Sequence, residues 1–200
     1  MDKKLITPEA IKAICVKKGY KFFENDTKDL NLNIIGVRSK DMTPNTFNDL
    51  MCLLWKYKGV WNVKVYNATT DPGTYYLEKP MNVKGTAIMC PGQYSGVYIL
   101  GKHTGYPALQ QVKPIKVYRD NDKDNVFDLD PKTLESGVNA TNIHHAGANS
   151  TQVNNWSAGC MVIAKLTDWD EFIGLCTKSV DIYGNSFSYT LLNEEDFLNL

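Results

Sequence analysis

Residues 59 to 200 have the pattern of a mainly β domain of the α+β class, with a few flanking helices. From Trp61 onward, short runs rich in β-branched and aromatic residues recur, as expected for strands. Turn-forming clusters at Asp71-Pro72-Gly73, Cys90-Pro91-Gly92 and Gly101 separate these runs. Residues 1 to 58 mix helix and strand signals, so we expect an N-terminal segment that packs on, or leads into, the core.

The N-terminal segment begins with a helix signal. Thr7 is suited to cap this helix, Pro8 fits its first turn and Gly19 fits its end. Residues 32–38 then predict a strand. Thr43-Pro44 predicts the start of a second, amphipathic helix, with an apolar stripe that would pack in the core. That stripe is Phe47, Leu50, Met51, Leu54 and Trp55.

A change of pattern near Lys58-Gly59 marks a weak boundary between the two segments. After it, strands are predicted at 63–66, 74–77, 86–89, 97–100, 115–118, 161–164 and 187–192. Residues 167–172 predict a helix with acidic residues in its first turn. The 43% hydrophobic content over 200 residues is enough for one substantial core.

The charge balance argues against two classes of partner. Lys plus Arg and Asp plus Glu number 22 each, so the chain has no overall attraction for nucleic acid or an anionic membrane. No run approaches the length of about 18 apolar residues that a membrane span needs. Pro8, Glu9 and Lys12 interrupt any signal peptide. We therefore expect no nucleic-acid partner, no membrane span, no signal peptide and synthesis in a cytoplasm.

The five cysteines are odd in number and widely spaced, with no Cys-x-x-Cys pair. They do not form a disulfide framework, and at least one thiol is free. One of them, Cys160, lies in Ser157-Ala158-Gly159-Cys160, soon after the pair His144-His145. A thiol with a pKa of about 8.5 needs a base to become a good nucleophile, and a histidine can be that base.

The turn before Cys160 also suits carbonyl chemistry. Small residues let the backbone turn sharply, so the amides of Gly159 and Cys160 are candidates for an oxyanion hole. The apolar run after the cysteine predicts a buried strand that would hold the sulfur on a rigid element. The alternative is a cysteine that only fills space in the core, which is the commoner role of this residue.

The His and Ser-x-Gly-Cys pattern resembles the catalytic motif of the YkuD, or L,D-transpeptidase, family. Residues 68–77 resemble the Thr-Pro-x-Gly-x-Phe segment that precedes this motif. Segments 91–94, 101–103 and 118–120, with the ending Asn-Trp-Ser-Ala-Gly-Cys, are closest to a phage-encoded branch. The resemblance covers about residues 60 to 165. It implies a YkuD-like β-sandwich or barrel, with residues 59–200 as the cysteine catalytic domain.

Carried over by position, the resemblance makes Cys160 the nucleophile and His144 the general base. His145 is the weaker candidate, because neighbouring side chains of a strand point to opposite faces. The chain departs from the family where Ala158 replaces a second histidine and where Val162 replaces the common Arg or Asn. These departures leave the acyl-transfer groups intact and put the substrate and acceptor in doubt.

Five other residues are candidates for the site. His103, in a glycine-flanked loop, and His145 could contact substrate. Arg119 could bind a carboxylate of a peptide, or form an ion pair with Asp120 or another neighbour. Trp156 could form a wall of the pocket or pack in the core. Ser157 could orient the histidine or hydrogen-bond within its own turn.

Two groups of residues have side chains of the kinds that bind metals. Residues 120–128 alternate oxygen ligands like the start of a calcium loop, but Asn125 and Pro131 stand where such a loop has its Gly and Glu. Zinc bound by His103, one of the paired histidines and Cys160 would satisfy ligand chemistry without any known spacing motif. We therefore expect a solvated polar turn at 120–128, no metal and no cofactor.

The resemblance implies a peptidoglycan-active cysteine enzyme that cleaves or exchanges stem-peptide cross-links. Hydrolysis is favoured, because a phage has more use for cutting walls than for building them, which makes a lytic or virion-associated murein peptidase the expected role. Without a signal peptide, the protein would act at the wall after release from a host cytoplasm, or within a phage particle beside other virion proteins. The alternative is a non-catalytic virion structural or wall-binding protein on the same fold.

Overall fold

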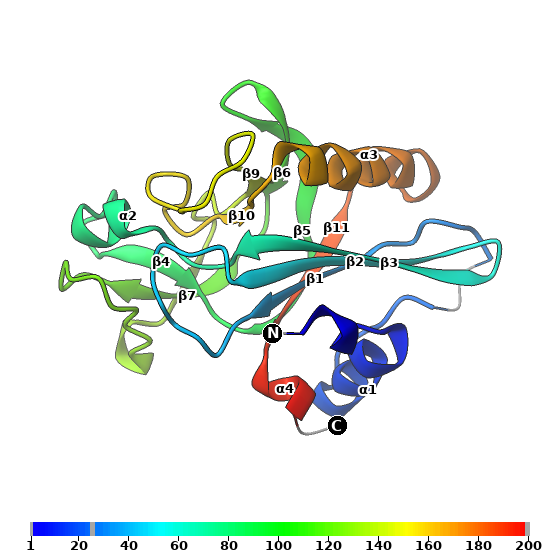
Figure 1. The fold of residues 1–200 in the computed structure, drawn as a ribbon, viewed down its shortest axis with the longest axis horizontal. Coiled ribbons are helices and arrows are strands. Elements are labelled where there is room, and N and C mark those ends of the chain that lie inside the picture. Colours follow the sequence, from blue (N-terminus) through cyan, green and yellow to red (C-terminus); the bar gives the residue numbers. More distant parts are fainter. Residues whose placement is uncertain (1, 25–26, 199–200) are drawn as a thin grey trace.

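The computed structural model describes residues 2–24 and 27–198, and the fold is mainly β (Figure 1). The strands are β1 (Asn33–Arg38), β2 (Asp49–Tyr57), β3 (Val60–Thr69), β4 (Thr86–Met89), β5 (Gly92–His103), β6 (Tyr106–Gln111), β7 (Ile115–Asp120), β8 (Glu135–Gly137), β9 (Ile143–His145), β10 (Met161–Ile163) and β11 (Phe187–Asn193). The expected α+β class with few helices is confirmed at this level.

Eight strands close into a barrel in the order β1-β11-β5-β6-β9-β10-β3-β2, and β4-β7-β8 form a separate three-stranded sheet. Most neighbouring strands are antiparallel. The exceptions are β1 with β11, which pairs Ile34 with Tyr189, and β9 with β10, which pairs His144 with Val162. The parallel pair β9-β10 brings the histidine segment beside the cysteine segment.

The helices are α1 (Pro8–Lys18), α2 (Thr74–Glu78), α3 (Leu166–Tyr183) and α4 (Glu195–Leu198), with 3₁₀ turns at Lys3–Leu5 and Pro131–Thr133. In Figure 1, α3 lies on one side of the barrel, α1 and α4 lie together on another, and α2 lies beyond β4. The Thr7 side chain accepts a hydrogen bond from the Ala10 amide, and Gly19 ends α1 with φ at 71°. The predicted cap and stop of this helix are confirmed.

The second helix, predicted to run from Thr43-Pro44 through Trp55, is wrong, because Asp49–Tyr57 form strand β2. Its residues are buried on both faces: Met51 and Leu53 belong to the core inside the barrel, while Leu50 and Cys52 pack with α1 and α4. A strand buried on both sides has no polar alternation. Its continuous apolar run therefore resembled a helical stripe, an ambiguity that periodicity cannot resolve.

The strand predicted at 74–77 is wrong, because Thr74–Glu78 form helix α2. The amides of Tyr76 and Leu77 both donate to the Gly73 carbonyl, which starts a helical turn, and Leu77 is fully buried. The aromatic residues that favoured a strand here are overruled by the tertiary position of the segment. The other predicted strands lie within or closely match observed ones, and the helix predicted at 167–172 is the first part of α3.

The predicted boundary at Lys58-Gly59 lies in the tight turn between β2 and β3, which pair along their whole length from Asp49–Ala68 to Tyr57–Val60. Strands on both sides of this turn belong to one closed barrel. The N-terminal segment thus contributes β1 and β2 to that barrel, in addition to α1.

A buried charge network joins three strand ends. The Arg38 guanidinium lies 2.8 Å from an Asp71 carboxylate oxygen and also donates to the carbonyl and hydroxyl of Thr70. Asp49 accepts hydrogen bonds from the Ser39 amide and from the amide and hydroxyl of Thr70. Burial, followed by the charge of Asp71, raises the pKa of Asp49, while burial also raises the pKa of Asp71 against the effect of Arg38.

Arg38→Met is expected to destabilise the protein by about 3 to 5 kcal/mol near neutral pH, because it leaves two buried acids without their cation. Since Arg38 lowers the pKa of both acids, its loss raises their folded pKa further. The deficit should therefore shrink, by up to about 1.4 kcal/mol per pH unit and proton, as pH falls and the two acids take up protons in the folded parent too. Urea unfolding at several pH values measures the effect.

Lys64→Met is the matched control, because it breaks the exposed Lys64–Glu171 pair. It should cost at most about 1 kcal/mol, with little dependence on pH. Equal losses in the two variants would contradict the structural importance of the buried network.

Candidate active site

A cleft of about 880 Å³ opens between the barrel and the three-stranded sheet. Its lining comes from four regions: α2 and β4, the turn between β5 and β6, β7 with the segment after β8, and the segments around β9 and before β10. Five of the eight predicted site residues line it: they are His103, Arg119, His144, Trp156 and Cys160. The size is typical of a site for a small ligand or part of a peptide.

Ser157 organises the turn that carries the cysteine. Its hydroxyl donates to the Cys160 carbonyl at 2.7 Å and accepts from the Gly159 amide at 3.1 Å. Its carbonyl accepts from the Gly73 amide, which ties the turn to the segment after β3. Ser157 is therefore a turn residue, as one of the two predicted roles had it, and it makes no hydrogen bond with a histidine among the described residues.

Gly159 fits only as glycine. Its φ is 115°, and a Cβ atom there would lie 2.4 Å from the Ala87 carbonyl oxygen of β4. Its amide is already used by Ser157, which corrects its predicted part in an oxyanion hole. In the described part of the chain, the Cys160 amide has no hydrogen-bond partner, so it is the remaining donor of the predicted pair.

The Cys160 thiol is partly exposed, whereas the other four cysteines are buried. Its sulfur accepts a hydrogen bond from the Asn142 amide at 3.4 Å and lies 3.6 Å from the Ala140 carbonyl, to which it donates. Packing around the sulfur raises the pKa of Cys160 to about 11, with the Asn142 amide acting in the opposite direction. No imidazole hydrogen-bonds the sulfur within the described residues, so the resting group is a neutral thiol.

His144 is 2% exposed and lies on β9, one strand away from the cysteine. Because it pairs with Val162, it shares a strand face with Cys160, two residues earlier on the neighbouring strand. Its Nδ1 lies 2.9 Å from the His145 carbonyl, which can only accept, so this nitrogen carries the proton. The Nε2 atom is left as the proton acceptor, and burial lowers the pKa of His144 to about 4.

His103 stacks on His144, with ring centroids 4.2 Å apart and planes 9° from parallel. It is the last residue of β5 and faces Tyr106 across a two-residue turn, which corrects its predicted place in a loop. Asn142 donates to its Nδ1 at 3.3 Å, while the Asn142 side-chain oxygen accepts from the Gln111 amide. Burial lowers the pKa of His103 as well, so two neutral rings lie against each other.

Two residues of this arrangement were missed by sequence reasoning. The Tyr106 hydroxyl lies 3.2 Å from His144 Nδ1, and Asn142 contacts both His103 and the cysteine sulfur. Asn142 precedes His144 by two residues, so strand alternation alone would have placed it on the same face. Thr104-Gly105 is a short turn that would have placed Tyr106 opposite His103.

His145 faces away from the cleft. Its ring packs 4.3 Å from Tyr106 and 5.8 Å from Trp169 of α3, and it does not line the cleft. The predicted alternation of the two histidines is thus observed, and the candidate role of His145 in contacting substrate is not supported by its position. Trp156 is 38% exposed and forms part of the cleft wall, the first of its two predicted roles.

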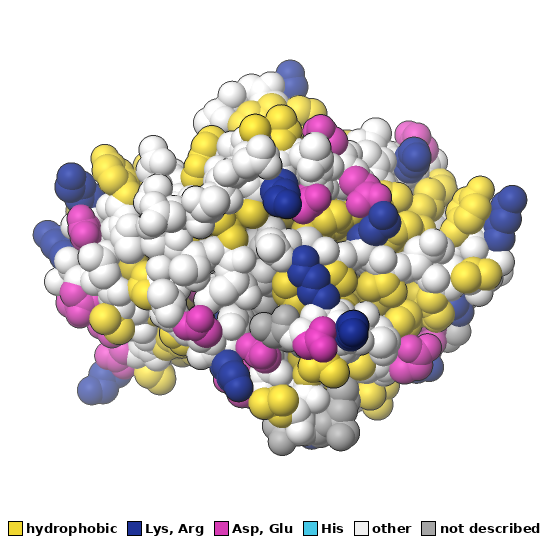
Figure 2. Space-filling view, viewed as in Figure 1, with side chains coloured by type: hydrophobic (Ala, Val, Ile, Leu, Met, Phe, Trp, Pro, Cys, Tyr) yellow, Lys and Arg dark blue, Asp and Glu magenta, His cyan; other side chains and the backbone are white. Residues whose placement is uncertain are grey.

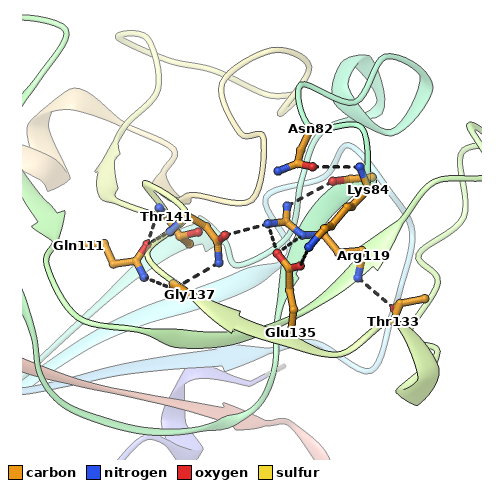
Figure 3. A network of polar contacts seen from close by, with 10 residues as sticks. Asn82, Lys84, Gln111, Arg119, Thr133, Glu135, Gly137 and Thr141 are labelled. Atoms are coloured by element: carbon orange, nitrogen blue, oxygen red, sulfur yellow. Dashed lines mark hydrogen bonds and ion pairs between the residues drawn. The ribbon is translucent and has the colours of Figure 1, made fainter.

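Arg119 is committed to a network in the wall (Figure 3). Its guanidinium donates to Glu135 through Nε and Nη2, to Asn139 and to the Gly85 carbonyl. It is 8% exposed, although it lines the cleft. Arg119 forms the predicted ion pair with a neighbour, which is Glu135 rather than Asp120. These bonds occupy the guanidinium nitrogens, so the side chain cannot also bind a substrate carboxylate in a bidentate manner.

The zinc set considered from the sequence is not assembled. In residues 2–24 and 27–198, the one group of three or more His, Cys, Asp or Glu with ligand atoms within 4.8 Å of one another is Asp120, Asp122 and Asp128. On the face shown in Figure 2, positive and negative side chains are interspersed with hydrophobic ones. None of the described helices combines the length and apolar character needed to cross a membrane.

Comparisons with protein-family models, with curated proteins and with solved structures found no match to this chain.

Cys160 is expected to be alkylated by iodoacetamide faster than the other four cysteines, because it alone reaches the cleft. Its rate should rise steadily with pH beyond about 9, since a pKa of about 11 leaves little thiolate at neutral pH. Peptide mapping by mass spectrometry at a series of pH values measures each site. A rate that levels off below about pH 8 would contradict the neutral resting thiol.

Proposed function

We propose that this chain is a cysteine acyl-transfer enzyme that acts on the stem peptides of peptidoglycan, the activity implied by its resemblance to the YkuD-like L,D-transpeptidases. One observation supports the proposal most: a partly exposed thiol and an imidazole with an unprotonated Nε2 line one cleft from adjacent parallel strands. Because His144 pairs with Val162 and Cys160 lies two residues before Val162, the two side chains are diagonal neighbours on one face.

In this proposal, His144 Nε2 takes the proton of the Cys160 thiol as the sulfur attacks a stem-peptide carbonyl. To do so, the thiol gives up its hydrogen bond to the Ala140 carbonyl and turns toward His144. A hydrogen bond between a nucleophile and its base often tightens only when substrate binds. The carbonyl oxygen becomes an oxyanion, for which the Cys160 amide is the available donor. The proton on His144 then passes to the leaving amine, which departs as a thioester remains on Cys160.

The second half of the reaction repeats the first with another nucleophile. A water molecule or an amine gives its proton to His144 and attacks the thioester carbonyl, and the sulfur leaves as His144 returns this proton to it. Water yields an endopeptidase or carboxypeptidase, and an amine yields a transpeptidase. We favour hydrolysis, in keeping with a phage lytic or virion-associated role, and this choice rests on the resemblance alone.

The surroundings of His144 support a base that stays neutral at ordinary pH. The stacked His103 and the enclosing β-structure exclude water from the ring, and the His145 carbonyl fixes its tautomer. A base with a pKa of about 4 is fully available near neutral pH, although it is a weak proton acceptor. The proposed enzyme thus works from a neutral thiol and imidazole rather than from a preformed ion pair.

A specific observation favours the rival function, a non-catalytic wall-binding or virion protein on this fold. The sulfur has no hydrogen bond with an imidazole in the described residues, and packing raises the pKa of its thiol. The cleft could then bind a peptide without reacting with it. Binding of sacculi by the parent and by Cys160→Ala alike, with no release of fragments by either, would favour this function over the enzyme.

Cys160→Ala is expected to abolish the release of muropeptides from purified sacculi, and His144→Gln should lower kcat/KM by about 10²- to 10⁴-fold. His145→Gln is the matched control, because its ring faces away from the cleft and its loss should leave most of the activity. Mass spectrometry of the products identifies the cleaved bond and the acceptor. Parent-like digestion by Cys160→Ala would refute the cysteine mechanism.

The pH dependence of kcat/KM supplies a separate check. Since burial lowers the pKa of His144 to about 4, the base loses its function only when pH falls through about 4. The acid limb of the profile is therefore expected well below the usual histidine value of about 6.5. An acid limb at about pH 6 to 7 would indicate that the base is a histidine with an unperturbed pKa, which would contradict the assignment to His144.

A further inference from the structure

The loop that follows β7 gathers three carboxylates at one point. One oxygen from each of Asp120, Asp122 and Asp128 lies within 4.8 Å of the other two. Oxygens that bind one calcium ion at about 2.4 Å can be at most about 4.8 Å apart, so a single ion fits among all three. The group lies outside the cysteine and histidine site and has no part in the proposed reaction.

The buried member of the group has an unused oxygen. Asp120 is 0% exposed, its Oδ2 accepts from the Asp128 amide at 3.0 Å, and its Oδ1 is buried with no hydrogen-bond partner among the described residues. A buried carboxylate oxygen without a partner is costly, and a cation is the partner that its neighbours favour. None of the ion pairs found in the described residues joins Lys or Arg to these three carboxylates.

From the cluster and the unpartnered buried oxygen, we infer that Asp120, Asp122 and Asp128 bind a calcium ion. All three ligands are carboxylates, which suit hard cations rather than zinc or copper. Calcium tolerates irregular coordination and completes its shell with backbone carbonyls and water, whereas magnesium demands near-octahedral geometry. Two of the three carboxylates are exposed, so the ion can enter from solvent.

The electrostatics of the loop favour a bound cation. Burial, with added repulsion from Asp122, Asp128 and Asp124, raises the pKa of Asp120 to about 6. The charge of Asp122, with a small contribution from burial, raises the pKa of Asp128. A bound dication would remove this repulsion and favour the ionised forms.

Calcium at this point would brace one wall of the cleft. Gly85, which precedes β4, packs so closely that a Cβ atom there would lie 2.2 Å from the Asp120 carbonyl oxygen. Gly85 and Arg119 both line the cleft, and Arg119 donates to the Gly85 carbonyl. The ion would thus hold the loop after β7 against the end of the β4-β7 pair, independently of any chemistry at Cys160.

The test uses the full chain, freed of metal with a chelator and then titrated calorimetrically with calcium chloride or magnesium chloride. One calcium is expected to bind per chain, with a rise in Tm of roughly 5 to 10 °C at a hundredfold excess over Kd. The double variant Asp122→Asn, Asp128→Asn keeps the buried Asp120 and changes only exposed positions. It should lose at least about tenfold in affinity and most of the rise in Tm.

Asp170→Asn is the matched control, because it removes an exposed carboxylate from α3, on the far side of the molecule from β7 in Figure 1. It should bind calcium like the parent. The absence of calcium binding up to about 10 mM, or equal binding by the double variant and the parent, would overturn the site. An equal response to magnesium would overturn its assignment to calcium. These readouts do not depend on activity, so they stand or fall separately from the proposed function.

Discussion

The buried ion pair between Arg38 and Asp71 is the constraint on which the geometry of the cleft depends. It ties the end of β1 to the segment that leaves β3, and Asp49 of β2 binds the same segment through Thr70. From there the connection passes through the Gly73 amide to the Ser157 carbonyl, and through the Ser157 hydroxyl to the carbonyl of Cys160. The position of the thiol thus depends on charged side chains that are buried at the ends of β1, β2 and β3. This dependence gives a reason for keeping charged groups in the apolar interior.

Burial of the two reactive groups gives the site its chemical character. The same packing that raises the pKa of Cys160 lowers that of His144, so both groups are neutral at rest. The stack of His103 on His144 adds to this effect, because two adjacent rings resist being charged together. Proton transfer between two buried neutral groups separates charge where solvent stabilises it poorly. The transfer therefore needs hydrogen-bond donors near the new oxyanion to be favourable. The Cys160 amide is therefore as important to the proposed chemistry as the base.

The sequence allowed parts of this arrangement to be predicted, and the physical reasons for the failures are clear. The spacing and small residues around Cys160 identified the turn, and strand alternation separated His144 from His145 correctly. Strand β2 was mistaken for a helix because both of its faces are covered, so it shows no alternation. The use of the Gly159 amide by Ser157 could not be foreseen, since it depends on the shape of one turn. Arg119 was recognised as a candidate for an ion pair, but its partner Glu135 comes from a strand that the sequence pattern did not reveal.

The parallel pairing of β1 with β11 has a consequence for how the chain matures during synthesis. These strands join residues near 34 to residues near 189, and β11 also separates β1 from β5 in the ring of strands. The ring therefore stays open until residues near 189 have left the ribosome, and long-range pairing of this kind forms slowly. A nascent chain exposes unpaired strand edges during that interval, and the barrel beside the cleft is not yet closed. Such timing would delay the final geometry around the Cys160 thiol until β11 has been synthesised and has paired with β1.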